Sequence, residues 1–338
     1  MTDIPDIGLR GMACFLPPTR KAVADIFRDE NISADREIAG VRFTEALGIE
    51  TVHVAGDLMA AELGLHAARA ALDEADVDPA DLDLILDFTS IPEDYIAPTW
   101  SAAGQVQYAL GAHRAVATAV NTGGCASFHL ALQTALAWMR GDPACRTALL
   151  FSGDKTPPRN HTYFPITVIC DGGGAVVLQR NARRRVVLAV ETATVGQLHD
   201  VWFVPGPTRS DLAPPGQHLH MQCHLERFFE DVIPINLFMF RKVMRAVLKK
   251  TGYRMEDIDL FIYPTFSTWD LKSFCEGFRI PPEKVYTEGL ARHGHLQETD
   301  MVLNYVDAER EGRVKSGDLV MLTTNGAGFT WGAALIRH

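Results

Sequence analysis

Apolar and polar residues follow two different periods along the chain. Stretches with apolar residues every three or four positions, the helical period, are separated by short continuous apolar runs rich in Val, Ile, Leu and Phe. Continuous apolar runs of this length are typical of strands that helices bury on both faces. The order of these elements predicts an α/β protein with helices packed on a buried sheet.

Two segments repeat the same order of elements. Residues 67–90 (AARAALDEADVDPADLDLILDFTS) and residues 240–266 (FRKVMRAVLKKTGYRMEDIDLFIYPTF) each predict a helix, a turn, a D-[LI]-D-L entry and a buried strand. Ile258 of the second segment lies 176 residues after Leu82 of the first. We infer that the chain contains two duplicated units.

The repeat predicts two halves, residues 1–185 and residues 186–338. Between the repeated elements, residues 201–240 change from proline and glycine to dense aromatic and methionine content. This segment has two interpretations: a cap that lines a substrate cleft, and ordinary core packing. In a duplicated fold, equivalent loops meet near the pseudo-twofold axis, so Cys125 from the first half is expected to face His293 or His295 from the second.

Composition limits the possible functions. The chain has 338 residues, 47% of them apolar, and a formal net charge of −10, which argues against nucleic-acid binding. No run of about 18 uncharged apolar residues is present, and the N-terminus lacks the pattern of a signal peptide, so we expect a soluble, cytoplasmic protein without membrane partners. Six cysteines without CxxC spacing favour neither a disulfide framework nor structural zinc.

One cysteine occupies a position that is suited to a catalytic nucleophile. Cys125 follows the pair Gly123 and Gly124 at the start of an amphipathic helix. The unpaired N–H groups and partial positive charge of a helix N-terminus stabilise a thiolate, and the glycines leave room for a substrate. An arbitrary cysteine is more often a buried core residue, but this position favours a nucleophile. A second glycine-rich loop within residues 323–338 has backbone N–H groups that are suited, with that of Cys125, to bind an oxyanion.

Three motifs carry a resemblance to a known family. NTGGCASFHLAL, ICDGGGAVVL and GRVKSGDLVMLTTNGAGFTWGAALIRH resemble β-ketoacyl-acyl-carrier-protein synthase III of the thiolase superfamily, and the similarity covers nearly the whole chain. The resemblance implies a five-layered αβαβα sandwich of two related halves, a homodimer, no tightly bound cofactor, and a cysteine that accepts an acyl group as a thioester. Cys125 matches that nucleophile, and Ala327 matches the amide of the oxyanion hole. It also implies substrate contacts at Ala97, Thr265, Phe266, Gly326 and Phe329.

The chain departs from the family at two motifs. Condensing members carry a histidine and an asparagine where this chain has Thr265 and Thr268 in YPTFST, and a second asparagine where it has His295 in HGHLQ. A threonine hydroxyl cannot reproduce the proton and charge control of a histidine near neutral pH. Decarboxylative condensation is therefore put in doubt.

The second departure favours acyl transfer. His295 is suited to deprotonate Cys125 and then an incoming hydroxyl or amine. We favour Asp300 as the group that orients its imidazole, because this combination resembles the ester-forming ketosynthase-III-like acyltransferases of natural-product biosynthesis, the branch of the cervimycin malonyltransferase. Residues five apart on one helix point about 140° apart, so Asp300 can orient His295 only if His295 precedes the helix. Glu298 is the alternative orienting acid, and His293 is the lesser candidate for the base.

Other residues bear on the acyl donor, its carrier and metal binding. The family stretch that grips coenzyme A reads RFTEALGIETVHVA here, without evident basic and stacking groups, which favours an acyl-carrier-protein thioester over coenzyme A as the donor. One predicted helix carries five basic residues suited to dock an acidic carrier protein or simply to face solvent: Arg241, Lys242, Arg245, Lys249 and Lys250. The HLHMQCH stretch, with His218, His220, Cys223 and His224, fits no zinc pattern, so we predict no metal site.

Three hypotheses remain open. The leading one is transfer of an acyl group, possibly of malonyl type, from a thioester through Cys125 to a hydroxyl or amine acceptor without loss of carbon dioxide. The second is a decarboxylative condensation that uses a rearranged His295. The third is a non-catalytic partner subunit, which the retention of Cys125 and the glycine loop disfavours.

Overall fold

The computed structural model describes most of the chain. The described residues are 6–33, 35–38, 40–90, 101–120, 122–157, 159–203 and 221–338. Within them, no helix has both the length and the apolar character needed to cross a membrane.

A ten-stranded sheet forms the frame of the molecule. In spatial order its strands are β16 (Val285–Tyr286), β15 (Leu260–Ile262), β17 (Leu319–Gly326), β18 (Thr330–Arg337), β12 (Val186–Thr194), β1 (Ile7–Phe15), β11 (Gly172–Arg180), β8 (Thr147–Asp154), β6 (Leu84–Asp87) and β7 (Val116–Ala119). The sheet consists of two similar groups of strands that meet where β12 and β1 pair at Gly8 and Val186.

The two groups share one pairing scheme. In the first, β6 is parallel to β7 and β8, and β11 is antiparallel to β8 and β1. In the second, β15 is parallel to β16 and β17, and β18 is antiparallel to β17 and β12. Equivalent strands therefore occupy equivalent places, as the repeat predicts.

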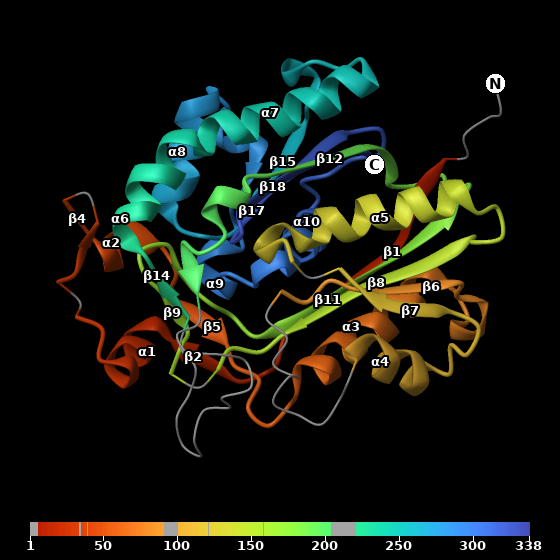
Figure 1. Cartoon of the computed structure of the whole chain (residues 1–338), viewed down its shortest axis with the longest axis horizontal. Helices are drawn as coiled ribbons and strands as arrows, with labels where there is room; N and C mark the ends of the chain where they lie inside the picture. The colour runs from red at the N-terminus through yellow and green to blue at the C-terminus, as the bar shows by residue number, and fades with distance from the viewer. Residues whose placement is uncertain are drawn as a thin grey trace.

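Helices form three layers around these strands. Helices α3 (Ala60–Ala75) and α4 (Ala102–Leu110) cover the first group, and α7 (Ile233–Thr251) covers the second together with α8 (Thr268–Phe278). Helices α5 (Ser127–Gly141) and α10 (Asp300–Arg310) lie between the groups and contact strands of both (Figure 1). This arrangement confirms the predicted five-layered αβαβα sandwich.

Shorter elements complete the described structure. They are β2 (Arg20–Ala22), α1 (Val23–Glu30), β3 (Glu37–Ile38), β4 (Val41–Arg42), α2 (Phe43–Leu47), β5 (Thr51–His53), β9 (Thr162–Tyr163), β10 (Thr167–Val168), β13 (Trp202–Phe203), β14 (Gln222–Cys223), α6 (Leu225–Arg227) and α9 (Leu290–His293), with single 3₁₀ turns and one π-helical turn, Phe228–Val232.

The D-[LI]-D-L motifs have a structural explanation. The Asp83 carboxylate accepts hydrogen bonds from the amides of Arg146 and Thr147, at 2.8 and 3.1 Å, where β8 begins. The Asp259 carboxylate accepts one from the amide of Leu319, at 2.8 Å, where β17 begins. Each aspartate thus fixes the start of the parallel strand beside its own, and the repeated motif reflects a repeated contact.

The central layer positions the functional loops. Helices α5 and α10 bury apolar faces in one shared core, whose members include Leu132, Leu136, Met301 and Val302. Each helix follows a 3₁₀ turn, Gly124–Ala126 before α5 and Gln297–Thr299 before α10. Since both helices are fixed in the same layer, the two turns that precede them lie close together.

Candidate active site

Cys125 lies in the 3₁₀ turn that leads into α5. Gly124 has a φ of 52°, in the left-handed region, and a Cβ atom there would lie 2.5 Å from the amide nitrogen of Ala327. A Cβ atom at Gly326 would likewise lie 2.4 Å from the amide nitrogen of Cys125. Glycine at both positions lets the two loops pack backbone to backbone, which brings the amides of Cys125 and Ala327 to the same end of the sheet.

His295 belongs to the equivalent loop of the second half. It lies between α9 and the turn before α10, and its backbone is held by strand-like bonds: its amide donates to the Val168 carbonyl at 3.1 Å, and its carbonyl accepts from the Cys170 amide at 2.8 Å. The side chain is only 2% exposed. Its Nε2 atom lies 3.3 Å from Cys125 Sγ, within hydrogen-bond reach of a thiol.

Asp300 is the first residue of α10 and contacts the other ring nitrogen. Its Oδ2 lies 2.6 Å from His295 Nδ1 and also accepts the Thr265 amide at 2.8 Å. Its Oδ1 accepts the Leu296 amide at 2.8 Å. His295 precedes the helix, so Asp300 can reach its ring, as the prediction requires. A carboxylate held by these bonds fixes the orientation of the imidazole toward Cys125.

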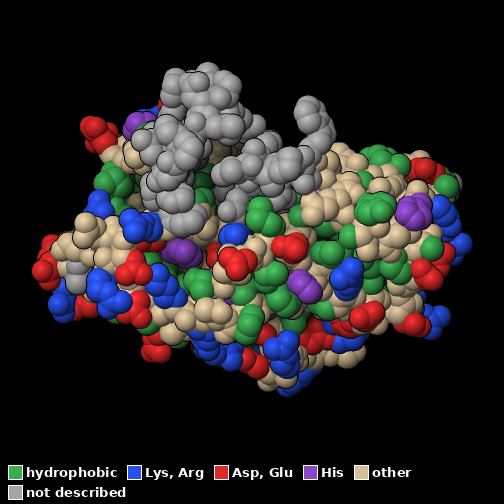
Figure 2. Space-filling model, turned by 90° about the horizontal axis from the view of Figure 1, so that it is seen from below, with side chains coloured by type: hydrophobic (Ala, Val, Ile, Leu, Met, Phe, Trp, Pro, Cys, Tyr) green, Lys and Arg blue, Asp and Glu red, His purple; other side chains and the backbone are tan. Residues whose placement is uncertain are grey.

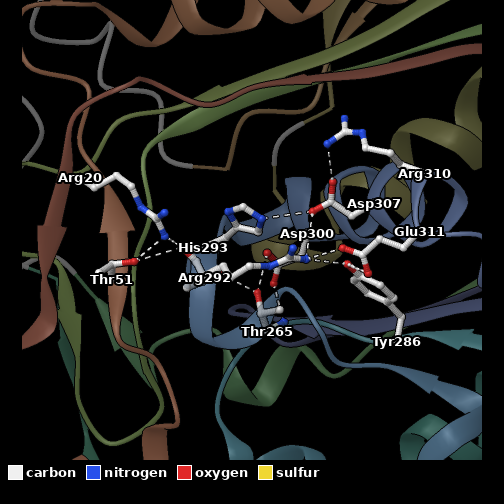
Figure 3. A network of polar contacts seen from close by, with 11 residues as sticks. Arg20, Thr51, Thr265, Tyr286, Arg292, His293, Asp300, Asp307, Arg310 and Glu311 are labelled. Carbon is white, nitrogen blue, oxygen red and sulfur yellow. Dashed lines mark hydrogen bonds and ion pairs between the residues drawn. The ribbon is translucent and has the colours of Figure 1, made fainter.

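Thr265 holds Asp300. Its hydroxyl lies 2.9 Å from Asp300 Oδ1 and 2.7 Å from the Gly294 carbonyl, as Figure 3 shows in part, and the residue is 3% exposed. With its amide also bonded to Asp300, both of its polar groups are engaged. The residue lies behind the cavity and does not line it, which differs from the predicted substrate contact. Thr265, which stands where condensing members of the resembled family carry a histidine, therefore supports the Asp300 carboxylate in this chain.

Glu298 points elsewhere. Its Oε1 accepts the Ser90 amide at 2.9 Å, and its carboxyl group hydrogen-bonds to that of Asp154. Both acids are fully buried, and one oxygen of each, Asp154 Oδ1 and Glu298 Oε2, has no other partner among the described residues. Burial raises the pKa of both, with the Glu298 charge adding to the rise at Asp154, so we infer that the pair shares one proton.

The same acids affect the nucleophile. Burial raises the pKa of the Cys125 thiol well above its usual value, and the carboxylates of Glu298, Asp300 and Asp154 raise it further. The expectation of a thiolate stabilised by the helix N-terminus is corrected here, because burial beside negative charge favours the neutral thiol. Attack by this sulfur then requires a base that removes the proton during the reaction, and His295 is placed to do so.

His293 has a different partner. Its Nε2 lies 3.1 Å from Asp307 Oδ2, and its ring stacks on that of His53 with centroids 5.6 Å apart. Figure 3 shows it with Arg292 in a polar network that includes Asp307 and Glu311. This network ties α9 to α10 and so fixes the ends of the loop that carries His295.

A cavity of about 150 Å³ opens onto Cys125 and His295. Of the predicted substrate contacts, Phe266, Gly326 and Phe329 line it with Ala327, and the Phe266 ring meets the His295 ring edge-on at a centroid distance of 4.6 Å. Ala97 lies outside the described residues. The structure thus brings the predicted nucleophile, base, amides and apolar contacts to one cavity.

The segment at residues 201–240 contributes one wall. Its described lining residues are Trp202, Met221, Phe228, Phe229, Val232, Ile233 and Asn236. Several of them come from the π-helical turn before α7, a distortion that is frequent at functional sites. Phe228 and Val232 also belong to the core beneath α7, so the segment both lines the cavity and packs the core.

Sequence reasoning missed some polar residues of the cavity. Asp270 and Asn236 line it on α8 and α7. Asp270 stands in the first turn of α8, where an acid normally indicates helix capping alone. Its position five residues after Thr265, in the segment that replaces a catalytic motif, is the signal that could have identified it.

The weaker predictions fall on the surface or outside the described residues. Arg241, Lys242, Arg245 and Lys249 are exposed on α7. His218 and His220 lie outside the described part of the chain, while the His224 ring stacks on that of Phe203 at 4.3 Å. Among the described residues, no three His, Cys, Asp or Glu side chains are grouped so as to hold a metal ion. Thr268 is exposed at the start of α8.

Comparisons with known proteins find similar sequences. Residues 248–338 match the family described as 3-oxoacyl-[acyl-carrier-protein] synthase III C terminal. The β-ketoacyl-[acyl-carrier-protein] synthase III of Brucella suis is 29% identical over 97% of this chain and 98% of its own length. The corresponding protein of Erythrobacter litoralis is also 29% identical and covers 98% of each chain.

Solved structures share the fold. The 3-oxoacyl-[acyl-carrier-protein] synthase III of Aquifex aeolicus superposes with a TM-score of 0.80 at 24% identity, over 98% of this chain and all of that one. The acyltransferase ChlB3 superposes with a TM-score of 0.81 at 23% identity, over 98% of each chain. The chain is thus similar to synthase III proteins over nearly its whole length, and it shares its fold with these solved structures.

Proposed function

We propose that this chain is a ketosynthase-III-like acyltransferase of natural-product biosynthesis, which moves an acyl group from a thioester to a hydroxyl acceptor without decarboxylation. The observation that carries the proposal is the continuous chain of contacts from Cys125 Sγ through His295 to Asp300, with Thr265 behind the acid. Nucleophile, base and orienting acid in this order are suited to acyl transfer.

The first half-reaction loads the cysteine. His295 Nε2 takes the thiol proton as Cys125 Sγ attacks the thioester carbonyl, and the amides of Cys125 and Ala327 stabilise the oxyanion. The carbon–sulfur bond of the donor then breaks, and the departing thiolate takes the proton from His295. The result is an acyl-enzyme and a free donor thiol.

The second half-reaction unloads it. His295 removes the proton from an acceptor hydroxyl as its oxygen attacks the acyl carbonyl, and Asp300 stabilises the imidazolium that forms. The bond to Cys125 Sγ then breaks, and the sulfur recovers its proton from His295. An ester leaves, and the resting thiol is restored. An amine acceptor follows the same route to an amide.

The place of Thr265 argues for retention of the donor carboxylate. Decarboxylation leaves an enolate, which a condensing enzyme stabilises through hydrogen bonds from groups in the cavity. Thr265 is buried outside the cavity and is bonded to Asp300. Decarboxylative condensation is nevertheless the second candidate, because the curated relatives are named as synthases of that kind.

We further propose an acyl carrier protein as the donor's carrier, with coenzyme A as the alternative. Basic residues on exposed positions of α7 have no acidic partner among the described residues: Arg241, Lys242, Arg245 and Lys249. Phe238, 64% exposed, lies on the same helix and offers an apolar contact. The opposite side of the molecule mixes basic and acidic side chains (Figure 2), which favours α7 for an acidic partner.

A homodimer through the β7 edge is part of this proposal. Among the described strands, β7 is the last of the sheet, and one side of its backbone has no strand partner. Val116 on this strand is 51% exposed, and Tyr108 on the neighbouring α4 is 80% exposed. Apolar side chains beside an open strand edge are suited to pair with a second copy of the chain.

The test of the transfer mechanism is separation of the two half-reactions. Wild-type protein incubated with malonyl and short acyl thioesters should gain the intact acyl mass on Cys125, and a hydroxyl acceptor should then remove it as an ester. Carbon dioxide release in the first step would instead favour condensation. No adduct with any donor would favour a non-catalytic subunit.

A further inference from the structure

A single carboxylate faces the cavity. Asp270 Oδ2 accepts a hydrogen bond of 2.7 Å from the buried Tyr263 hydroxyl, which fixes the side chain against the base of α8. Its Oδ1 has no hydrogen-bond or ion-pair partner among the described residues. Asp270 is thus half satisfied by the protein, and the remaining oxygen is left to a ligand.

The surroundings of Asp270 favour positive charge. The described lining of the cavity contains no lysine or arginine, and Asp270 is its one carboxylate. Aromatic side chains also line the cavity, including Trp269, Trp202 and Phe229. An ammonium group gains from the faces of such rings as well as from the carboxylate.

Burial also affects the charge state of Asp270. It raises the pKa of this carboxyl to about 6, although the Tyr263 hydrogen bond and His295 act to lower the pKa. The group is therefore ionised above pH 6 and protonated below it. A bound cation would favour the ionised form further.

We propose that the acceptor carries a protonated amine in addition to its attacking hydroxyl, and that Asp270 Oδ1 binds this ammonium group. The inference rests on the proposed function, since it names the acceptor class for the same cavity. An amine held as an ammonium ion has no free electron pair, so it cannot attack the acyl-enzyme. Asp270 would then direct transfer to the hydroxyl and yield an ester rather than an amide.

Binding of two matched probes tests the inference without turnover. The probes are 2-(dimethylamino)-3-phenylpropanol, whose tertiary amine cannot be stably acylated, and 3-phenylpropanol, which lacks the amine. Trp202 and Trp269 line the cavity, so tryptophan fluorescence can report binding to the donor-free protein at pH 8. Wild type should bind the amine probe at least about tenfold more tightly, as expected for a partly desolvated charge pair.

Matched variants assign the preference to Asp270. Asp270→Asn should reduce the affinity ratio to near one and leave 3-phenylpropanol binding unchanged, while Glu276→Gln, an exposed acid on the same helix, should keep the wild-type ratio. The wild-type ratio should also fall as the pH drops below about 6. Equal binding of the probes by wild type, no binding of the amine probe, or a preference retained in Asp270→Asn would each overturn the inference.

The two proposals fail separately. Acylation of Cys125 by a thioester, followed by intact mass, tests the proposed function and does not need Asp270. A protein that acylates normally but shows no preference for the amine probe would refute only the acceptor class. A protein with the preference but without acylation would refute the transfer function and retain the cation site.

Discussion

The two turns that precede the central helices α5 and α10 occupy equivalent places in the fold but carry different functional groups. The turn before α5 consists of glycines and small residues around one thiol. The turn before α10 is preceded by His295 and leads to Asp300, with Glu298 buried within it. The two halves provide equivalent positions with different roles. The first half carries the nucleophile, and the second carries the base that takes its proton.

The buried charge explains why this division is required. Burial raises the pKa of the thiol in the first half, and the carboxylates of Glu298 and Asp300 from the second half raise it further. A raised pKa favours the neutral thiol, whose proton His295 is placed to remove. The comparison predicts that substitution of the nucleophile in the first turn abolishes the reaction. Substitution of the base or of the acid that orients it, at the second turn, should lower the rate instead.

The largest effect is expected at the first turn. Cys125→Ala removes the sulfur and should abolish both the acyl adduct and turnover, with a loss of about 10⁴-fold or more. Circular dichroism and thermal unfolding should stay close to wild type, because Cys125 is a small, half-buried side chain. Intact mass after incubation with a thioester checks the result. An adduct that persists in this variant would show that another residue is the acceptor.

Asp300 should give the next largest effect. Asp300→Asn keeps the size of the side chain but offers His295 Nδ1 an amide where it now has a carboxylate, so the acylation rate should fall about 10²- to 10⁴-fold. Glu298→Gln is the matched control on the same turn, since Glu298 bonds to Ser90 and Asp154 rather than to His295. It should change the rate less than about threefold. Similar losses in both variants would contradict the assignment of the orienting acid.

Thr265 should give a smaller loss. Thr265→Val removes the hydroxyl near Asp300 Oδ1 but keeps the backbone amide bond, so acylation should slow by about 5- to 20-fold, in line with one lost supporting bond. Thr265→Ser restores the hydroxyl and should recover most of the rate. The Km for the acceptor should not change, because Thr265 does not line the cavity. A changed Km would return Thr265 to substrate binding.

The buried acid pair should give the smallest effect, and one of opposite sign. If Asp154 and Glu298 share one proton, Glu298→Gln leaves one negative charge, whereas the double variant Asp154→Asn/Glu298→Gln removes it. Removal of this charge lowers the pKa of Cys125, so the double variant should react about two- to tenfold faster with iodoacetamide at pH 8. An unchanged rate would show that the pair does not act on the thiol.

The fold could be predicted from local patterns. The repeated D-[LI]-D-L entries mark equivalent strands because Asp83 and Asp259 make the same contact in each half. Cys125 and His295 were predicted to meet because the repeat brings their loops together, and their separation of 3.3 Å agrees. Such predictions succeed where one local motif determines one contact.

Other features depend on neighbours distant in sequence. The charge state of Cys125 follows from acids on β8 and at the start of α10, which no local pattern places beside it. The role of Thr265 could not be read from its replacement of a histidine, since its hydroxyl turns away from the cavity toward Asp300. Asp270 was missed because its position on a helix start had a sufficient local explanation.

One measurement tests most directly whether Cys125 is the nucleophile and His295 is its base. Wild type, His295→Ala and Cys125→Ala are each incubated with a malonyl thioester, and intact mass and carbon dioxide release are followed together. Wild type should gain the full malonyl mass on Cys125 with no carbon dioxide, His295→Ala should acylate about 10²- to 10⁴-fold more slowly, and Cys125→Ala not at all. A decarboxylated adduct, or acylation at the wild-type rate without His295, would contradict the account.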